Sequence, residues 1–162
     1  MTNWTGTFYV LVSMVGATLL SCNRSATLTE TDKKTIVSDV TKMLHDYQRA
    51  VKESGLMAEL EYLDSSSNFF WVPPGYDAPL SYDSIATILK QNAPQFKTID
   101  NSFEALTVVP LTSDIAVYTG RMRSVMTDTS GMETIYVLKE TGVATRRNAY
   151  WRLLSGQTDL LK

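Results

Sequence analysis

The sequence predicts an α+β fold in which helices come first and an antiparallel sheet follows. Between residues 36 and 51, apolar residues recur at three- and four-residue spacing, as they do in an amphipathic helix. From residue 103 onward they alternate with polar ones, as they do in half-buried strands. Helices segregated from a run of strands indicate the α+β class. The roughly 140 residues after position 22 suit a single domain with its own core.

The first helix has recognisable ends. Thr29 and Asp32 stand at capping-box spacing, and Gly55 follows the apolar stripe as a C-terminal cap. The stripe comprises Ile36, Val40, Met43, Leu44, Tyr47, Ala50 and Val51. A second, short helix is expected over 56–63, and a third over 82–92, with Ser81 as its cap.

The remaining elements are strands. Residues 69–72 form a short aromatic strand that Pro73-Pro74-Gly75 ends, with Phe69 and Trp71 facing one side and Phe70 the other. A meander is expected over 103–109, 115–128, 133–140, 146–154 and 158–161. Its turns are expected at Thr129-Ser130-Gly131 and, as a hairpin, at Ser155-Gly156, with a bulge or break at Thr141-Gly142.

The N-terminal segment ends in Leu19-Leu20-Ser21-Cys22, which resembles the lipobox of bacterial lipoproteins. The uncharged stretch before it, from residue 8 to 20, is shorter than the about 20 residues of a membrane-spanning helix and fits the apolar core of a signal peptide. The resemblance implies a signal peptide over 1–21, lipid on Cys22, a lipidated tether over 22–30 and a domain over 31–162. The alternative is an uncleaved anchor helix. With the lipobox, we expect a cell-envelope protein, held by lipid at the outer membrane or at the outer face of the cytoplasmic membrane.

Composition excludes several chemistries. Cys22 is the only cysteine, so its lipidation leaves no thiol for a disulfide, a zinc site or a nucleophile. A formal charge of −2 gives no sign of a nucleic-acid surface. The single histidine, His45, lies about half a turn from the apolar stripe, beside Lys42 and Arg49, and is expected on a solvated face. We therefore predict neither a metal site nor a cofactor.

The order of the elements, the strand-and-turn FFWVPPG at 69–75 and the segment YWRLLSGQ at 150–157 resemble the nuclear transport factor 2-like superfamily. This superfamily includes SnoaL-like and ketosteroid-isomerase-like proteins, and the resemblance covers residues 31–162. It implies a cone-shaped, strongly curved antiparallel sheet with three helices. A cavity is expected between the concave face and the helices, and a homodimer is expected through the outer face.

The family resemblance also bears on catalysis. In the isomerase-like members, a general-base aspartate directly precedes a Pro-x-Gly turn. Val72 stands at that position here and cannot accept a proton, so isomerase chemistry of this kind is not expected. Glu104, in the middle of a strand, is expected on the solvent side, with the cavity as its alternative.

Two sets of residues are candidates for binding. The first is an aromatic pocket, whose alternative is plain core or dimer packing, made of Tyr47, Trp71, Tyr118, Tyr136 and Tyr150. The second is an anion clamp at the mouth of the cone, centred on Arg121 and Arg146 with Arg123 and Arg147 beside them. The alternative for these arginines is cross-strand pairing with Asp128, Glu133 and Glu140.

Three functions follow. The first is a membrane-tethered, non-catalytic module that binds a small amphipathic molecule or docks an envelope protein. The second is a SnoaL-like or dehydratase-like enzyme acting on a small apolar substrate. The third is a purely structural dimerisation module. An open cavity with paired titratable groups favours the enzyme, an open apolar one favours binding, and a filled one favours assembly.

Overall fold

The computed structural model describes Met1 and residues 27–161. The predicted signal peptide, Cys22 and most of the tether lie outside the described residues. Within 27–161, no helix is both long and apolar enough to cross a bilayer.

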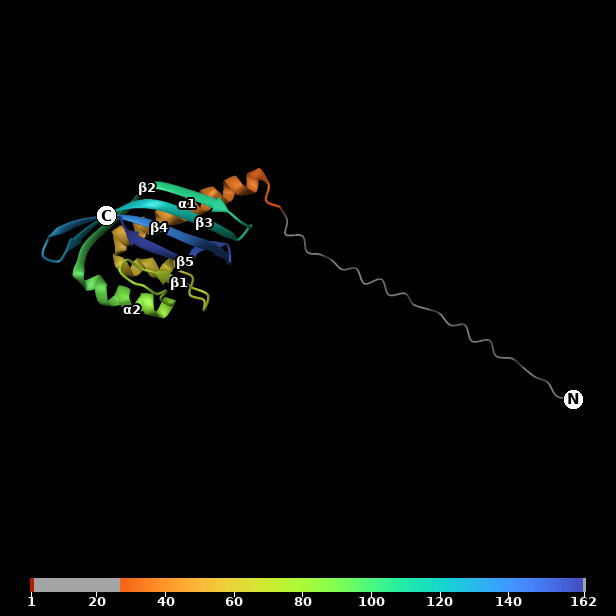
Figure 1. Cartoon of the computed structure of the whole chain (residues 1–162), viewed down its shortest axis with the longest axis horizontal. Coiled ribbons are helices and arrows are strands. Elements are labelled where there is room, and N and C mark those ends of the chain that lie inside the picture. Colours follow the sequence, from red (N-terminus) through yellow and green to blue (C-terminus); the bar gives the residue numbers. More distant parts are fainter. Residues whose placement is uncertain (2–26, 162) are drawn as a thin grey trace.

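The described chain contains two α-helices, two short 3-10 helices and five strands in one sheet (Figure 1). The helices are α1 (Glu30–Ser54), η1 (Leu56–Glu61), α2 (Tyr82–Asn92) and η2 (Ala93–Gln95). The strands are β1 (Phe70–Val72), β2 (Phe96–Pro110), β3 (Ile115–Asp128), β4 (Glu133–Arg147) and β5 (Tyr150–Leu160). The sheet has the strand order β1-β5-β4-β3-β2. The α1 helix packs mainly against β2, whereas α2 packs against η1 and β1. The predicted α+β class is confirmed.

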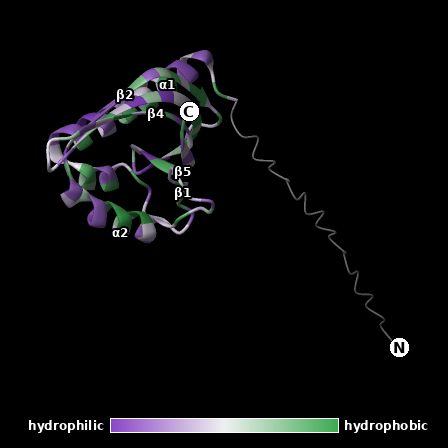
Figure 2. Cartoon of the chain, turned by 60° about the vertical axis from the view of Figure 1, so that its left-hand side comes forward, coloured by the Kyte–Doolittle hydropathy of each residue, from purple (hydrophilic) through white to green (hydrophobic). Residues whose placement is uncertain are grey.

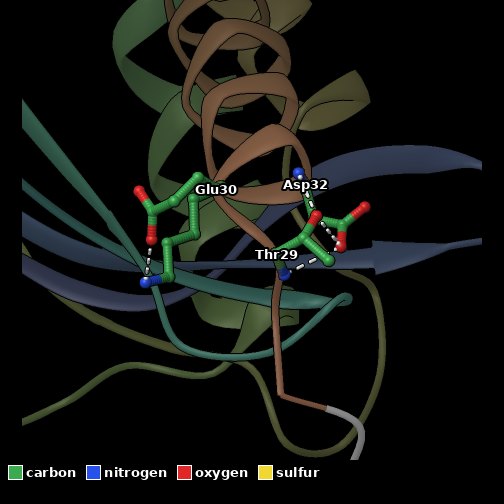
Figure 3. A network of polar contacts seen from close by, with 4 residues as sticks. Thr29, Glu30 and Asp32 are labelled. Carbon is green, nitrogen blue, oxygen red and sulfur yellow. Dashed lines mark hydrogen bonds and ion pairs between the residues drawn. The ribbon is translucent and has the colours of Figure 1, made fainter.

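The capping box predicted for the first helix is present (Figure 3). The Thr29 backbone N–H donates to Asp32 Oδ2 at 3.0 Å, and Thr29 Oγ1 accepts from the Asp32 backbone N–H at 3.1 Å. The two contacts satisfy backbone donors that the helix leaves free, and the Asp32 charge suits the positive end of the helix dipole. Gly55 closes the helix with φ 83°, and its N–H donates to the Val51 carbonyl at 2.9 Å.

The sheet differs from the prediction in the direction of one strand. Strands β2 to β5 form an antiparallel meander, but β1 joins the edge of β5 in parallel, so the sheet is mixed. Trp71 of β1 also forms an isolated antiparallel bridge with Leu80, just before α2. This bridge ties the loop after Pro73-Pro74-Gly75 to the strand and brings α2 back beside it.

The hairpin predicted at Ser155-Gly156 is wrong, and the strand predicted over 146–154 has the wrong bounds. The chain turns instead at Asn148 and Ala149, whose φ angles are 50° and 71°, and β5 runs unbroken from residue 150 to 160. The Ser-Gly pair suggested a turn because glycine is common there. The bulge or break predicted at Thr141-Gly142 is absent there, since β4 continues through both residues, but the register of β4 with β5 shifts next to it, between Val143 and Ala144. The strand predicted from 103 begins earlier, at Phe96.

Both strand glycines are explained by close packing rather than by turning. Gly142 and Gly156 are cross-strand partners, with Tyr118 and Trp71 as their respective neighbours on the flanking strands. A Cβ on Gly142 would lie 2.7 Å from the Tyr118 ring, and one on Gly156 would lie 2.6 Å from the Trp71 ring. The side chains of Tyr118 and Trp71 therefore pack directly against the backbone of the two glycines on the concave face.

The core lies between the helices and the concave face of the sheet. The stripe of α1 is buried there together with Leu63, Tyr118 and Leu153. Phe69 and Trp71 are both buried while Phe70 is 47 % exposed, as the alternation of a strand requires. Green and purple bands alternate along both α-helices in Figure 2, as expected for helices that bury one face only.

Candidate functional site

A cavity of about 200 Å³ lies inside the cone. It is bounded by α1, η1, β1, α2 and the concave side of strands β3 to β5. Most of its lining is apolar. The polar side chains that reach it are Tyr47, Glu59, Trp71, Glu140 and Thr158. The apolar ones are Leu63, Phe69, Pro73, Pro74, Ile85, Ile88, Leu89, Met122, Met126, Leu138 and Leu153.

Glu140 is the centre of a buried hydrogen-bond network. Its carboxylate is 5 % exposed and accepts two bonds, from the Tyr118 hydroxyl at 2.8 Å and from Thr158 Oγ1 at 3.1 Å. The indole N–H of Trp71 donates to Thr158 Oγ1 at 3.1 Å. Four strands, β1, β3, β4 and β5, thus each contribute one member of the network.

The strand register explains why these side chains meet. Glu140 and Thr158 are direct partners on β4 and β5, one step along the same face from the Gly142–Gly156 pair. Because Gly142 has no side chain, the Tyr118 ring lies across it, and the hydroxyl reaches Glu140 on the next inward position of β4. Trp71 lies across Gly156 and reaches Thr158 in the same way.

Glu59 is the second carboxyl group of the cavity. It is half-buried on η1, the short helix that follows the Gly55 cap. Burial raises the pKa of Glu59 from its ordinary value of 4.5 to about 7, and the nearby charge of Glu140 adds to the rise. Hydrogen bonding with the Tyr47 hydroxyl acts in the opposite direction. Glu59 therefore exchanges its proton close to neutral pH, where a general acid–base group is most effective.

The two carboxyl groups have different surroundings. Burial raises the pKa of Glu140 as well, but the bonds donated by Tyr118 and Thr158 favour its ionised form. For Glu59, the Tyr47 hydroxyl is the one such donor. We conclude that Glu140 is the better stabilised of the two as a carboxylate and that the first proton taken up by the pair resides on Glu59. Burial raises the pKa values of Tyr47 and Tyr118 far above neutrality, so both hydroxyls stay protonated.

The structure brings together some of the predicted pocket aromatics. Tyr47 and Trp71 line the cavity, and Tyr118 lies just behind its wall, bonded to Glu140. Tyr136 and Tyr150 are outside it, with exposed fractions of 37 % and 69 %. Tyr150 is the first residue of β5, directly after the β4–β5 turn. Tyr136 lies near the start of β4, at the opposite end of the β4–β5 hairpin.

The proposed clamp arginines do not converge. Arg121 pairs with Glu104 at 2.7 Å on the outer face of the sheet. Arg146 pairs with Asp114 at 3.1 Å and lies over the Trp151 ring. Both arginines are thus engaged by carboxylates, although not by the three carboxylates that the sequence suggested. Arg147 pairs with Asp64, another carboxylate outside that set.

Other predicted positions lie where the sequence placed them. His45 is exposed, with its ring edge-on to Phe103, and Glu104 is on the solvent side. Within the described part of the chain, no group of three His, Cys, Asp or Glu residues is arranged to hold a metal ion.

Sequence reasoning missed Glu59, Glu140 and Thr158 as a site. Glu140 looked like an arginine partner, because its inward direction depends on a strand that runs unbroken through Gly142. Thr158 was placed beyond a turn that does not exist. The alternation of Leu138, Glu140 and Gly142 on one face of β4 was the available signal, since it puts a carboxylate among apolar neighbours.

Comparison with known proteins gives structural matches only. No family model and no curated protein sequence matches this chain. A nuclear transport factor 2-like superfamily protein from Salmonella enterica superposes with a TM-score of 0.68 at 13 % identity, covering 80 % of this chain and 93 % of that one. A protein from Streptomyces avermitilis, assigned as a dehydratase of the same family, gives 0.68 at 15 % identity, with 80 % and 98 % covered.

A third match is a hexachlorocyclohexane dehydrochlorinase from Novosphingobium barchaimii, with a TM-score of 0.66 at 9 % identity, covering 83 % of this chain and 92 % of that one. At these identities, the matches establish the architecture alone. The chain has the nuclear transport factor 2-like fold.

Proposed function

We propose that the cone cavity binds a small, largely apolar molecule and that Glu59 transfers a proton to and from it, as in an elimination or isomerisation. The observation that carries this proposal is the pair of carboxyl groups, Glu59 and Glu140, in an otherwise apolar cavity. A group with a pKa of about 7 can both take and return a proton at physiological pH.

The elimination balances without a cofactor. The Glu59 carboxylate removes a proton from a substrate carbon, and the C–H electron pair becomes the new double bond. The leaving group departs with its own bonding pair. The proton on Glu59 then passes to the leaving group or to water, which restores the carboxylate. The apolar walls keep the pKa of Glu59 high by excluding water, and the charge of Glu140 adds to that effect.

Two structural neighbours support this reaction class at the level of the fold. The names of both proteins denote eliminations: a dehydrochlorinase removes hydrogen chloride, and a dehydratase removes water. The support is analogy, because one fold hosts many activities.

The proposal is tested with 5-nitrobenzisoxazole, a small neutral aromatic whose ring opens once a base removes its C3 proton. The N–O bond breaks and a coloured phenolate appears. The wild-type protein should accelerate ring opening, with a pH–rate midpoint near 7. Glu59→Gln should lower the protein-catalysed rate by about a hundredfold, while the outward-facing Glu104→Gln should leave it unchanged. Equal rates for wild type and Glu59→Gln would reject the catalytic role.

Non-catalytic binding is the second candidate, and the apolar lining of the cavity favours it. Both oxygens of Glu140 are already engaged, which suits a rigid binding wall as well as a catalytic one. Saturable binding of 5-nitrobenzisoxazole without ring opening would favour this reading.

We further propose that the domain is tethered to a membrane in the cell envelope through lipid on Cys22. The support is the lipobox-like sequence and the lack of any other cysteine.

Dimerisation through the outer sheet face is also a proposal. Val109 and Ile135 support it, because they stand on that face with about half of their side-chain surface exposed. Analytical ultracentrifugation tests it. The wild type should sediment as a dimer, and Ile135→Lys should sediment as a monomer.

A further inference from the structure

We propose that the natural ligand of the cone cavity carries a positively charged amine attached to a compact apolar body. The inference rests on the proposed function for the location of the site, and it adds the chemical class of the ligand.

The first observation is the sign of the charged groups. Both ionisable acids of the cavity, Glu59 and Glu140, contribute to its lining, and its described lining residues include no lysine, arginine or histidine. Two arginines on neighbouring segments are engaged elsewhere. Arg147 pairs with Asp64, and Arg152 donates to the Glu61 carbonyl at 2.8 Å. The carboxylate charge inside the cone is therefore not balanced by a cation of the lining.

The second observation is what each kind of ligand would do to that charge. An anion would be repelled by the carboxylate of Glu140, the form that its two hydrogen bonds favour. A neutral molecule filling the cavity would displace water from Glu59 and leave the charge of the pair uncompensated. An ammonium group would compensate it in surroundings of low polarity, where the attraction is strongest. Of the three charge types, only the cation improves the electrostatics of the closed site.

The third observation is the shape and nature of the walls. Aromatic rings of Tyr47, Phe69 and Trp71 line the cavity, and aromatic walls of this kind attract a cation. The volume of 200 Å³ equals that of about seven water molecules, enough for one ring with a short chain. The α2 helix contributes only apolar residues, which would receive the body of the ligand.

The pH dependence follows from the groups facing Glu59. They are Tyr47 from α1, Glu140 from β4, and Tyr118 behind it from β3, while β1 and β5 present the uncharged Trp71 and Thr158. Both tyrosines stay neutral near pH 7, so the net charge of the site changes there through Glu59. An aliphatic amine remains charged throughout this range. Its affinity should rise between pH 6 and pH 8, and that of a neutral ligand should not.

The test compares three molecules with similar apolar parts and different charges: 2-phenylethylamine, 2-phenylethanol and phenylacetate. Binding to the full-length protein in a non-ionic detergent is measured by titration calorimetry at pH 6 and pH 8. We expect the amine to bind at least about tenfold more tightly than the alcohol at pH 8, with phenylacetate weakest. Glu59→Gln should abolish the rise in amine affinity with pH, whereas Glu104→Gln should retain it.

The outcomes separate the two proposals. An alcohol that binds as tightly as the amine would overturn the cationic ligand while leaving the cavity as a binding site. Failure of all three molecules to bind would overturn the cationic ligand, and failure of 5-nitrobenzisoxazole in addition would reject the proposed function. If Glu59→Gln does not fold, the order of the three affinities in the wild-type protein decides.

Discussion

The indole of Trp71 lies directly over the backbone of Gly156, its partner in the parallel pair of β1 and β5. A methyl group on Gly156 would come within 2.6 Å of the ring and 2.5 Å of the Thr141 carbonyl oxygen. This contact holds Trp71 at the angle from which its N–H reaches Thr158 and, through it, Glu140. The absence of a side chain on Gly156 thus allows Trp71 to form one wall of the cavity.

Gly156→Ala should destabilise the protein by about 1–3 kcal/mol, because the added methyl group meets backbone that cannot move aside. The effect should exceed the small gain that alanine gives over glycine in a strand. Urea unfolding measures it, with Gln157→Ala, an exposed neighbour, as the control. A Gly156→Ala protein as stable as the control would contradict the packing described.

Thr158→Val keeps the shape of the side chain and removes its hydroxyl. The Trp71 N–H then loses its acceptor and Glu140 loses one of its two donors. Leaving two buried groups unpaired should cost about 2–4 kcal/mol, measured by urea unfolding. Thr107→Val, at an exposed position on β2, is the matched control and should change stability by less than about 0.5 kcal/mol. Equal effects of both substitutions would show that the network contributes nothing to stability.

Glu59→Gln should stabilise the protein at high pH. Between about pH 4.5 and 7, folded Glu59 holds a proton that the unfolded chain has released, so its raised pKa lowers stability as the pH increases. Glutamine has no such penalty. Relative to wild type, we expect no gain at pH 4 and a full gain at pH 8, at most about 3 kcal/mol. Thermal unfolding of both proteins across this range measures it. A gain that is the same at every pH would argue against the titration of Glu59.

The sequence predicted the elements whose signals are local. The capping box at Thr29, the end of α1 at Gly55, and α2 were all confirmed, because neighbouring residues determine them. The elements that failed depend on distant contacts. Gly156 suggested a turn because nothing nearby reveals that Trp71, more than eighty positions earlier, packs over it.

The same reasoning explains the partial success at the site. Tyr47 was identifiable because it lies on a helical stripe, and Trp71 because it alternates with exposed neighbours. Glu140 was not, since its inward direction depends on the register of β4 with both flanking strands. Glu59 lies on a short 3-10 helix, where no periodicity indicates which side faces the core.

Cys22→Ala should abolish lipid attachment. Metabolic labelling with a fatty-acid analogue should mark the wild type and not the variant, and the variant should no longer partition into the detergent phase. Ser21→Ala keeps a small residue before the cysteine and serves as a control that should still be labelled. Equal labelling of the wild type and Cys22→Ala would place any lipid elsewhere and remove the basis for the tether.

The titration of Glu59 itself tests the coupling of Glu59 and Glu140 most directly. Carbon-13 labelling of the glutamate carboxyl groups, with Glu59→Gln to assign the resonance, gives its pKa by magnetic resonance. We predict a pKa of about 7 that falls towards the ordinary value in Glu140→Gln, because the neighbouring charge is then gone. A midpoint near 4.5 that Glu140→Gln does not change would contradict a coupled acid–base pair in the cone.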